Sequence, residues 1–488
     1  MSYNFKPSIF FLGATGYLGS EFLIRLQRDF PGLQINALVR SPTPERKAQL
    51  DAIYHGTHIV PGTLEDSQII LEESSKVDIV INCASSDHKP SVFAVLDGMN
   101  QSAARRPGNP PLLIHLSGAG IIADEARGAF KDNIPEHSDI GLDLRNCPPQ
   151  NTHLDSDIPI VDAGTRKDNP IRSIIIFPSG CYGVGNGVQK TSIWLRFFLE
   201  FVKKLNYVGT WGEGYNAIND VHIKDCADAL MVIFKAALEG RADEGAEGLY
   251  FCASSSRVPY REWTKVMGDY LYGYGHISQP GTCPMPNDVV DSMGFYGWSL
   301  LGGNHFCNSD RLAKLGWEPT ESKKHGLIET LPECLDEAWS FLSAQHFQAG
   351  AGRLLYFLYF TTLTIFTTSD SMHFLTIFAG ALVTVAVTSV TARPSLHSSG
   401  FTARDEYSDL SLRSLQNEAR DDYHALVVRD VLEAIYARDQ GPHLEARARF
   451  AGPRGGRFAH HQKDGPDAVP PPGPSMPQNP TRPTQLDK

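Results

Sequence analysis

The sequence predicts an α/β fold built on a doubly wound parallel sheet, followed by a smaller lobe. Short apolar runs alternate with helical patterns from residue 9 to residue 178. One of these runs, residues 77–84, is apolar almost throughout, which is typical of a strand buried on both faces of a parallel sheet. A glycine-rich turn links the first run to the first helix. Right-handed βαβ units would join these elements into one sheet.

The first domain is expected to span residues 1–185. Its six strands are expected at residues 9–12, 34–40, 58–61, 77–84, 112–117 and 171–178. A polar helix is expected at residues 43–54, between the second and third strands. Ligands of such sheets bind at the carboxyl ends of the strands, so the loops that follow the strands are the first place to look for a site.

The glycine-rich turn has the sequence GATGYLG, with Gly13, Gly16 and Gly19 at intervals of three residues. The first glycine permits a tight turn, the second lets a pyrophosphate approach the backbone, and the third lets helix and strand pack closely. The phosphates would face the positive end of the helix dipole. The alternative is a glycine turn that binds no ligand.

This turn resembles that of the extended short-chain dehydrogenases/reductases, the NAD-dependent epimerase/dehydratase group. Further similarities occur at residues 178–185, 221–225 and 309–317, so that the resemblance covers about residues 7–345. It implies a Rossmann fold, a bound nicotinamide dinucleotide, and a small-molecule substrate with a carbonyl or secondary alcohol. Within the group, residues 186–345 would form the substrate lobe.

The resemblance also implies a set of cofactor-binding residues. They are Gly13, Thr15, Gly16, Tyr17, Leu18, Gly19, Asp66, Cys83, Ala84, Ser117 and Pro178. Asp66 matches the aspartate that contacts the adenine amino group, a role compatible with capping a helix. For Cys83, the alternative is a small buried residue without a role in binding.

Arg40 ends the second predicted strand, where an acidic residue would bind a ribose 2′-hydroxyl. An arginine suits a 2′-phosphate instead, so the sequence favours NADP over NAD. The alternative is an ordinary surface arginine.

The predicted active site departs from the group's pattern. Ser117 matches the serine whose hydroxyl contacts the reacting oxygen, but the YxxxK motif is missing, and no tyrosine occurs between Tyr54 and Tyr182. His153 and Asp157 occupy the expected window four residues apart and form a candidate substitute pair, with imidazole in place of phenol. The alternative is a site without chemistry, in which His153 and Asp157 belong to a solvated helix start.

Composition excludes some other classes of function. The net charge of −11 argues against sequence-independent nucleic-acid binding. The eight cysteines are scattered without a CxxC pair, which suits reduced thiols in a cytoplasmic domain and predicts no metal site. Residues 1–6 are too short and polar for a signal peptide.

Residues 186–345 are less regular. Helices are expected at residues 194–205 and 227–238, and a strand at 248–253. Trp211, Tyr215 and His222 are candidates for lining a substrate cleft, although isolated aromatic residues in loops more often serve packing.

The last part of the chain, from residue 346, has a different character. Residues 354–366 are apolar but too short to cross a bilayer, whereas 372–392 contain a run long enough to do so. The latter run also has the features of a secretory signal peptide, which would make sense if two neighbouring genes were joined at Met372. Residues 393–488 are expected to be mostly disordered, with one helix at about 422–438.

The sequence therefore predicts an NAD(P)-dependent oxidoreductase or epimerase-like protein with an atypical active site. Two alternatives remain open at this point. One is a non-catalytic NADP(H)-binding sensor or scaffold, and the other is a dehydrogenase-like protein anchored in a membrane through residues 372–390.

Overall fold

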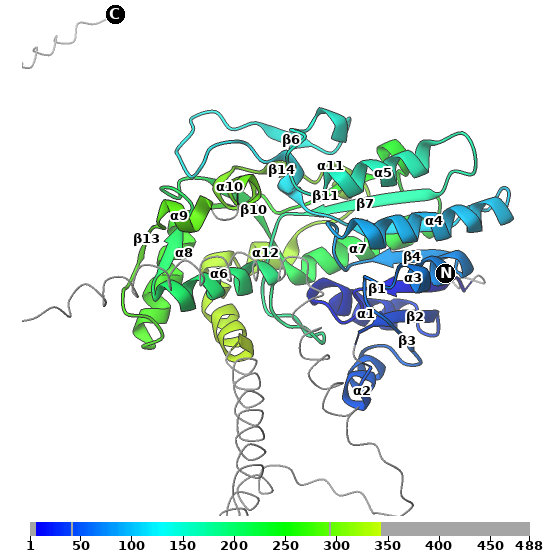
Figure 1. The fold of residues 1–488 in the computed structure, drawn as a ribbon, viewed down its shortest axis with the longest axis horizontal. Helices are drawn as coiled ribbons and strands as arrows, with labels where there is room; N and C mark the ends of the chain where they lie inside the picture. Colours follow the sequence, from blue (N-terminus) through cyan, green and yellow to red (C-terminus); the bar gives the residue numbers. More distant parts are fainter. Residues whose placement is uncertain (1–5, 41, 292–293, 343–488) are drawn as a thin grey trace, which may run out of the picture. The chain divides into compact units, whose positions relative to one another are not determined.

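Seven parallel strands form the central sheet of the computed structural model, which describes residues 6–342 except 41 and 292–293. Across the sheet their order is β3-β2-β1-β4-β5-β7-β11 (Figure 1). The strands are β1 (Ser8–Leu12), β2 (Gln34–Val39), β3 (His58–Pro61), β4 (Ile79–Asn82), β5 (Leu112–Leu116), β7 (Arg172–Pro178) and β11 (Leu249–Cys252). This order confirms the predicted doubly wound, Rossmann-like sheet.

Helices cover both faces of this sheet. The helices are α1 (Tyr17–Asp29), α2 (Pro44–Ile53), α3 (Ser67–Lys76), α4 (Lys89–Arg105), α5 (Leu154–Thr165), α6 (Ile193–Leu205), α7 (Ile223–Leu238), α8 (Tyr260–Gly273), α9 (Asn287–Val290), α10 (Gly294–Gly302), α11 (Asp310–Lys314) and α12 (Thr320–Lys324). Residues 327–342 are also helical. Helices α1 and α7 pack on one face of the sheet, and α4 and α5 on the other.

Strand β1 shows why the sheet needs both layers. Its residues Ile9 and Phe11 belong to the apolar cluster beneath α1 and α7, whereas Phe10 and Leu12 belong to the opposite cluster. Successive side chains of a strand point to opposite faces, so a strand that is apolar throughout requires cover on both sides. All four side chains are fully buried.

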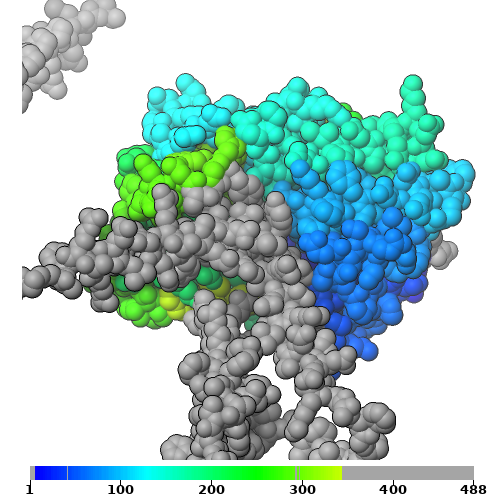
Figure 2. Space-filling view, viewed as in Figure 1, coloured from blue at the N-terminus to red at the C-terminus, as the bar shows by residue number. Residues whose placement is uncertain are grey.

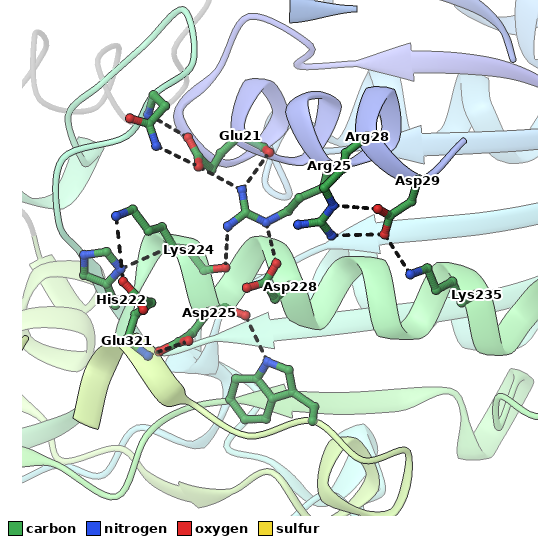
Figure 3. Close-up of polar contacts among 12 residues, drawn as sticks. Glu21, Arg25, Arg28, Asp29, His222, Lys224, Asp225, Asp228, Lys235 and Glu321 are labelled. Atoms are coloured by element: carbon green, nitrogen blue, oxygen red, sulfur yellow. Dashed lines mark hydrogen bonds and ion pairs between the residues drawn. The ribbon is translucent and has the colours of Figure 1, made fainter. Parts of the chain in front are cut away.

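Polar contacts also join α1 to α7 (Figure 3). Arg25 contacts Asp228 through Nε at 2.6 Å and Glu21 through Nη1 at 2.8 Å. The other carboxylate oxygen of Glu21 accepts a hydrogen bond from the backbone N–H of Asn186 at 2.7 Å. Glu21 is buried, and these partners satisfy its charge. The network thereby holds the first helix against the chain that leaves the first domain.

The second lobe has its own core. A small sheet contains β8 (Gly180–Tyr182), β10 (Ala217–His222) and β12 (Arg257–Pro259). Two-stranded sheets pair β9 (Val208–Thr210) with β13 (Thr282–Pro284) and β6 (Glu136–Ser138) with β14 (Phe306–Asn308). Aromatic rings pack between α6 and α8, where the ring centroids of Trp194 and Trp263 lie 4.6 Å apart. Figure 2 shows green segments of this lobe on the left and blue segments of the first domain on the right.

Both parts of the chain contribute to the central sheet. Strand β11 and helix α7 come from beyond residue 185 and return to it, next to β7 and α1 respectively. None of the helices in the described part of the chain combines the length and the apolar character needed to cross a bilayer. Three expected features lie outside the described residues: the apolar segments at 354–366 and 372–392, and the helix at 422–438.

Candidate active site

A cavity of about 760 Å³ lies at the carboxyl ends of the sheet strands and extends to the second lobe. Ten of the residues predicted to bind the cofactor line it: Gly13, Thr15, Gly16, Tyr17, Leu18, Arg40, Cys83, Ala84, Ser117 and Pro178. They come from the ends of β1, β2, β4, β5 and β7. The sheet topology thus gathers at one edge residues that are widely separated in the sequence.

The glycine turn packs without room for side chains. Gly13 has a φ of +81°, and a Cβ there would lie 2.5 Å from the backbone carbonyl carbon of Cys83. A Cβ on Gly19 would lie 2.1 Å from the carbonyl oxygen of Gly13. Gly16 is the N-cap residue of α1 and lines the cavity. The amino end of α1, where backbone N–H groups lack partners within the helix, therefore faces the cavity and suits an anion.

Two of the residues predicted to bind the cofactor do not line the cavity. Gly19 serves the packing of the turn, as its contact with Gly13 shows. The Asp66 carboxylate accepts hydrogen bonds from the backbone N–H and the hydroxyl of Thr63, at 2.7 and 2.9 Å. The Asp66 side chain thus fixes the turn before α3, in which Asp66 stands at the N-cap position without capping a helix N–H through its side chain, while Thr63 lines the cavity in its place.

Two arginines line the cavity beyond the glycine turn. Arg40 follows β2, as predicted, and Arg46 lies in the first turn of α2. Thr43 caps this helix by accepting a hydrogen bond from the backbone N–H of Arg46 at 3.2 Å. Arg46 was missed by the sequence reasoning. The signal was an arginine three residues after a threonine cap, on the helix next to Arg40.

Ser117 and Asp157 are in direct contact. The Ser117 hydroxyl, just after β5, donates a hydrogen bond to Oδ2 of Asp157 in α5 at 2.6 Å. Asp157 is fully buried. Burial raises the pKa of Asp157 to about 7, despite the opposing effects of His153 and the Ser117 hydrogen bond. Its protonation state can therefore change near neutral pH.

A buried histidine continues this chain of contacts. Asn82 Oδ1 accepts a hydrogen bond from the backbone N–H of Ala84 at 3.1 Å, which directs the Asn82 amide nitrogen toward His115 Nδ1, 3.2 Å away. Nδ1 of His115 is thus the acceptor, and the ring proton lies on Nε2, 3.6 Å from Asp157 Oδ1. Burial lowers the pKa of His115 to about 3, so the ring is neutral.

His153 precedes α5 as its N-cap residue, with a left-handed φ of 72°. Its Nδ1 lies 2.7 Å from Asp87 Oδ1 and 2.9 Å from the Ser86 hydroxyl. A carboxylate only accepts hydrogen bonds, so Nδ1 carries a proton. The other nitrogen, Nε2, faces Gly118, where a Cβ would lie 2.9 Å from it. Both His153 and Gly118 line the cavity.

The charges around His153 favour its protonated form. Burial alone would lower its pKa, but the contact with Asp87 and the charge of Asp157 outweigh this effect and raise the pKa above its ordinary value. An aspartate that orients one imidazole nitrogen while the other faces a cavity is the arrangement of a general acid or base.

The solvated helix start, the alternative interpretation of His153 and Asp157, does not match the structure. Both side chains are buried and engaged in polar contacts. Asp155, between them, is the exposed member of this turn and pairs with Lys89.

The tyrosines that line the cavity do not replace the missing one. The Tyr17 hydroxyl donates to the backbone oxygen of Gly183 at 2.6 Å, and burial raises its pKa far above the ordinary value. Burial likewise raises the pKa of Tyr260, which lies at the far side of the cavity.

The second lobe contributes different residues from those predicted. Trp211 is buried in the aromatic core, His222 is the N-cap residue of α7, and Tyr215 is exposed beside Arg261, so none of the three lines the cavity. Trp194, Phe197 and Leu300 line it instead. The sequence pattern indicated an amphipathic helix at 194–205, but not that part of its apolar surface faces a cavity.

The chain is similar to one curated protein in sequence and to several solved structures in fold. No family model matches the chain. The oxidase ucsJ of an Acremonium species is 27% identical over 287 residues, which cover 55% of this chain and 80% of that protein.

Solved structures similar to this one include two sugar-nucleotide enzymes. For a UDP-glucose 4-epimerase from Thermotoga maritima, solved with UDP-glucose, the TM-score is 0.47 at 13% identity, over 69% of this chain and 99% of that one. For DesIV, a dTDP-glucose 4,6-dehydratase from Streptomyces venezuelae solved with NAD, the TM-score is 0.48 at 16% identity, over 68% of this chain and 97% of that one. The chain thus has the Rossmann-like sheet and glycine turn expected from its resemblance to the epimerase/dehydratase group, and its structural neighbours include enzymes of that group.

Proposed function

We propose that this chain is a nicotinamide-dinucleotide-dependent oxidoreductase that interconverts a carbonyl and a secondary alcohol, with His153 in the role of the missing tyrosine. The observation that carries the proposal is the position of His153 Nε2 at the cavity wall, against Gly118, the residue after Ser117, with Nδ1 held by Asp87. The relationship to an oxidase and the Rossmann-like sheet support the same class of reaction.

The cavity suits the cofactor along its first-domain wall. The amino end of α1 at Gly16 would hold the pyrophosphate, and the chain after β4 at Cys83 and Ala84 would lie against the adenosine part. Arg40 and Arg46 bring two positive charges to the region after β2, which favours the 2′-phosphate of NADP over the hydroxyl of NAD. When bound, the nicotinamide supplies or accepts the hydride.

In the direction of reduction, His153 would donate the proton that the carbonyl oxygen needs as the carbon gains the hydride. The raised pKa of His153 favours the protonated ring, and Asp87 stabilises the imidazolium. In the direction of oxidation, neutral His153 would take the proton of the alcohol. General acid–base catalysis of this kind contributes roughly 10²- to 10⁴-fold in rate.

Ser117 would bind the reacting oxygen, and Asp157 would set the direction of its hydrogen bond. When Asp157 is ionised, it accepts a hydrogen bond from the Ser117 hydroxyl, and the single hydroxyl proton of a substrate alcohol is left for His153. When Asp157 is protonated, it can donate to Ser117, whose own proton then points to a substrate carbonyl. A carboxyl group with a pKa of about 7 serves both directions.

Hydride transfer tests the proposal. The protein is incubated with NADPH deuterated at C4 and, separately, glycerone or 2-decanone, and the products are examined by mass spectrometry for deuterium. We expect deuterium on the former carbonyl carbon of at least one product, and loss of this signal in a Ser117→Ala, His153→Phe double variant. If NADPH binds but no deuterium is transferred to either ketone, and UDP-glucose with NADP⁺ gives no NADPH, the chain is a dinucleotide sensor and the proposal fails.

A further inference from the structure

The part of the cavity in the second lobe is mainly apolar. Its wall includes Ile193, Trp194 and Phe197 of α6, Ile218 of β10, and Leu300 and Leu301 of α10. We call these six residues the apolar wall. They lie in the same cavity as Ser117 and His153, which is where a substrate carbonyl would be held.

Several side chains of the apolar wall are partly exposed to the cavity and not fully buried in the core of the second lobe. In α6, Phe198 and Leu199 are buried in the aromatic cluster, whereas Ile193, Trp194 and Phe197 on the same helix remain partly exposed. Leu300 is likewise partly exposed. Apolar side chains that stay exposed within a cavity gain from contact with an apolar ligand, because that contact removes their surface from water.

Positive charge is sparse beside this wall. Arg196 is the only arginine or lysine among the described residues that line the second-lobe part of the cavity, and its guanidinium lies over the Phe341 ring, 5.2 Å from the centroid. His305 is neutral there, because burial lowers its pKa to about 4, and its Nε2 lies 3.0 Å from the carbonyl oxygen of Ser299. Arg196 and the amino end of α6 could bind one anionic oxygen. A nucleoside diphosphate has two charged phosphate groups, which is more than this part of the cavity offers to neutralise.

On the apolar wall itself, the hydroxyl groups of a sugar would find few partners; the polar side chains of this part of the cavity are those of Gln189, Ser192, Arg196 and His305. A sugar placed against Trp194, Phe197 and Leu300 would lose its hydrogen bonds to water and gain few from these side chains. Burial of an unpaired hydroxyl is unfavourable. The chemistry of the wall therefore disfavours a nucleotide sugar and favours a hydrocarbon group.

From these contacts we infer that the substrate is an apolar carbonyl or alcohol compound, whose reacting oxygen lies at Ser117 and His153 and whose hydrocarbon part covers the apolar wall. This inference rests on the proposed function and narrows it to a substrate class. It distinguishes the chain from the epimerase solved with UDP-glucose, whose fold it shares.

Calorimetric titration of the full chain saturated with NADP⁺ tests the inference. The probes are 2-butanone, 2-hexanone, 2-decanone and UDP-glucose. We expect affinity for the ketones to rise with chain length, up to about fourfold for each methylene that becomes buried. UDP-glucose should bind more weakly than 2-decanone. Equal affinities for all ketones, or tighter binding of UDP-glucose, would overturn the inference.

Two variants locate the binding surface. Phe197→Asn and Leu300→Asn should each weaken 2-decanone binding at least tenfold and leave NADPH binding unchanged. The matched control is Phe93→Asn, which alters an exposed phenylalanine of α4 outside the cavity. NADPH titration distinguishes a failure of the proposed function from a failure of the substrate inference. If the unaltered protein does not bind NADPH, the proposed function is contradicted. Retained cofactor binding without a chain-length effect contradicts only the inference about the substrate.

Discussion

The Ser117 hydroxyl lies 2.6 Å from the Asp157 carboxylate, and Asp157 lies four residues after His153. In the YxxxK pattern, a lysine follows the tyrosine by four residues, and here an aspartate follows a histidine at the same spacing. A lysine would lower the pKa of a neighbouring phenol by its positive charge. Here the negative charges of Asp87 and, to a smaller extent, Asp157 raise the pKa of the His153 imidazole. A different side chain can thereby serve as the proton donor.

Replacement of Asp157 by asparagine should change how reduction depends on pH. In the unaltered protein, both His153 and Asp157 must be protonated for reduction, so kcat/KM should fall with a two-proton dependence as the pH rises past the pKa of Asp157, about 7, and the raised pKa of His153. In Asp157→Asn the fall should become a one-proton dependence. Its midpoint should be lower, because one of the two charges that raise the pKa of His153 is gone while that of Asp87 remains.

The measurement is kcat/KM for NADPH oxidation with 2-decanone between about pH 5 and about pH 9. Asp155→Asn is the matched control, since Asp155 is exposed on the same helix turn and should keep the two-proton profile. An unchanged profile in Asp157→Asn would show that Asp157 does not take part in proton control.

The same substitution should alter stability in one pH range. The pKa of Asp157 rises from 3.8 to about 7 on folding, so the folded state favours the protonated carboxyl. Its contribution is therefore present at low pH and is lost as the pH rises from about 4 to above 7. The free energy of unfolding of Asp157→Asn minus that of the unaltered protein should be larger at pH 8 than at pH 4. Urea unfolding at both pH values measures this difference. An opposite sign would mean that Asp157 is ionised in the folded protein at low pH.

Cofactor binding should depend on the glycine turn and on Arg40. Gly16→Asp places a negative side chain at the amino end of α1, where a pyrophosphate is expected, and should abolish binding of NADPH and NADH. Arg40→Asp should remove the preference for NADPH. The loss of one charge-assisted contact is worth about 1.5–3 kcal/mol, which corresponds to roughly 10- to 150-fold in affinity.

Fluorescence titration with both cofactors checks this prediction. Arg166→Asp, at a partly exposed position outside the cavity, controls for the change in net charge. Undiminished binding by Gly16→Asp would place the cofactor elsewhere, and an unchanged NADPH preference in Arg40→Asp would remove Arg40 from its recognition.

The fold was largely predictable from the sequence, because its signals are local. The apolar runs and the glycine turn fix the strands, and β2 and β7 begin and end within one residue of the expected positions. The site was less so. Asp87 and His115 were missed, since their roles depend on contacts with His153 and Asp157 across 66 and 42 residues of chain. Such contacts between remote segments leave no periodic pattern in a sequence.

A protein that ends at Gln345 should bind NADPH as tightly as the full chain. Among the residues that the structure describes, those that line the cavity lie between Gly13 and Phe341, and the strands of the central sheet lie between Ser8 and Cys252. Size-exclusion chromatography and NADPH titration of the shortened protein check this expectation. Aggregation of the shortened protein, with cofactor binding confined to the full chain in membranes, would show that the later residues belong to the functional unit.

The most direct test of the account is the turnover of His153→Phe with NADPH and 2-decanone. Loss of the proton donor should lower kcat by roughly 10²- to 10⁴-fold, while the affinity for NADPH stays the same. The control is His55→Phe, which makes the same change at an exposed histidine outside the cavity and should keep full activity. If His153→Phe instead turns over 2-decanone at the rate of the unaltered protein, His153 is not the acid that replaces the missing tyrosine, and the central claim is wrong.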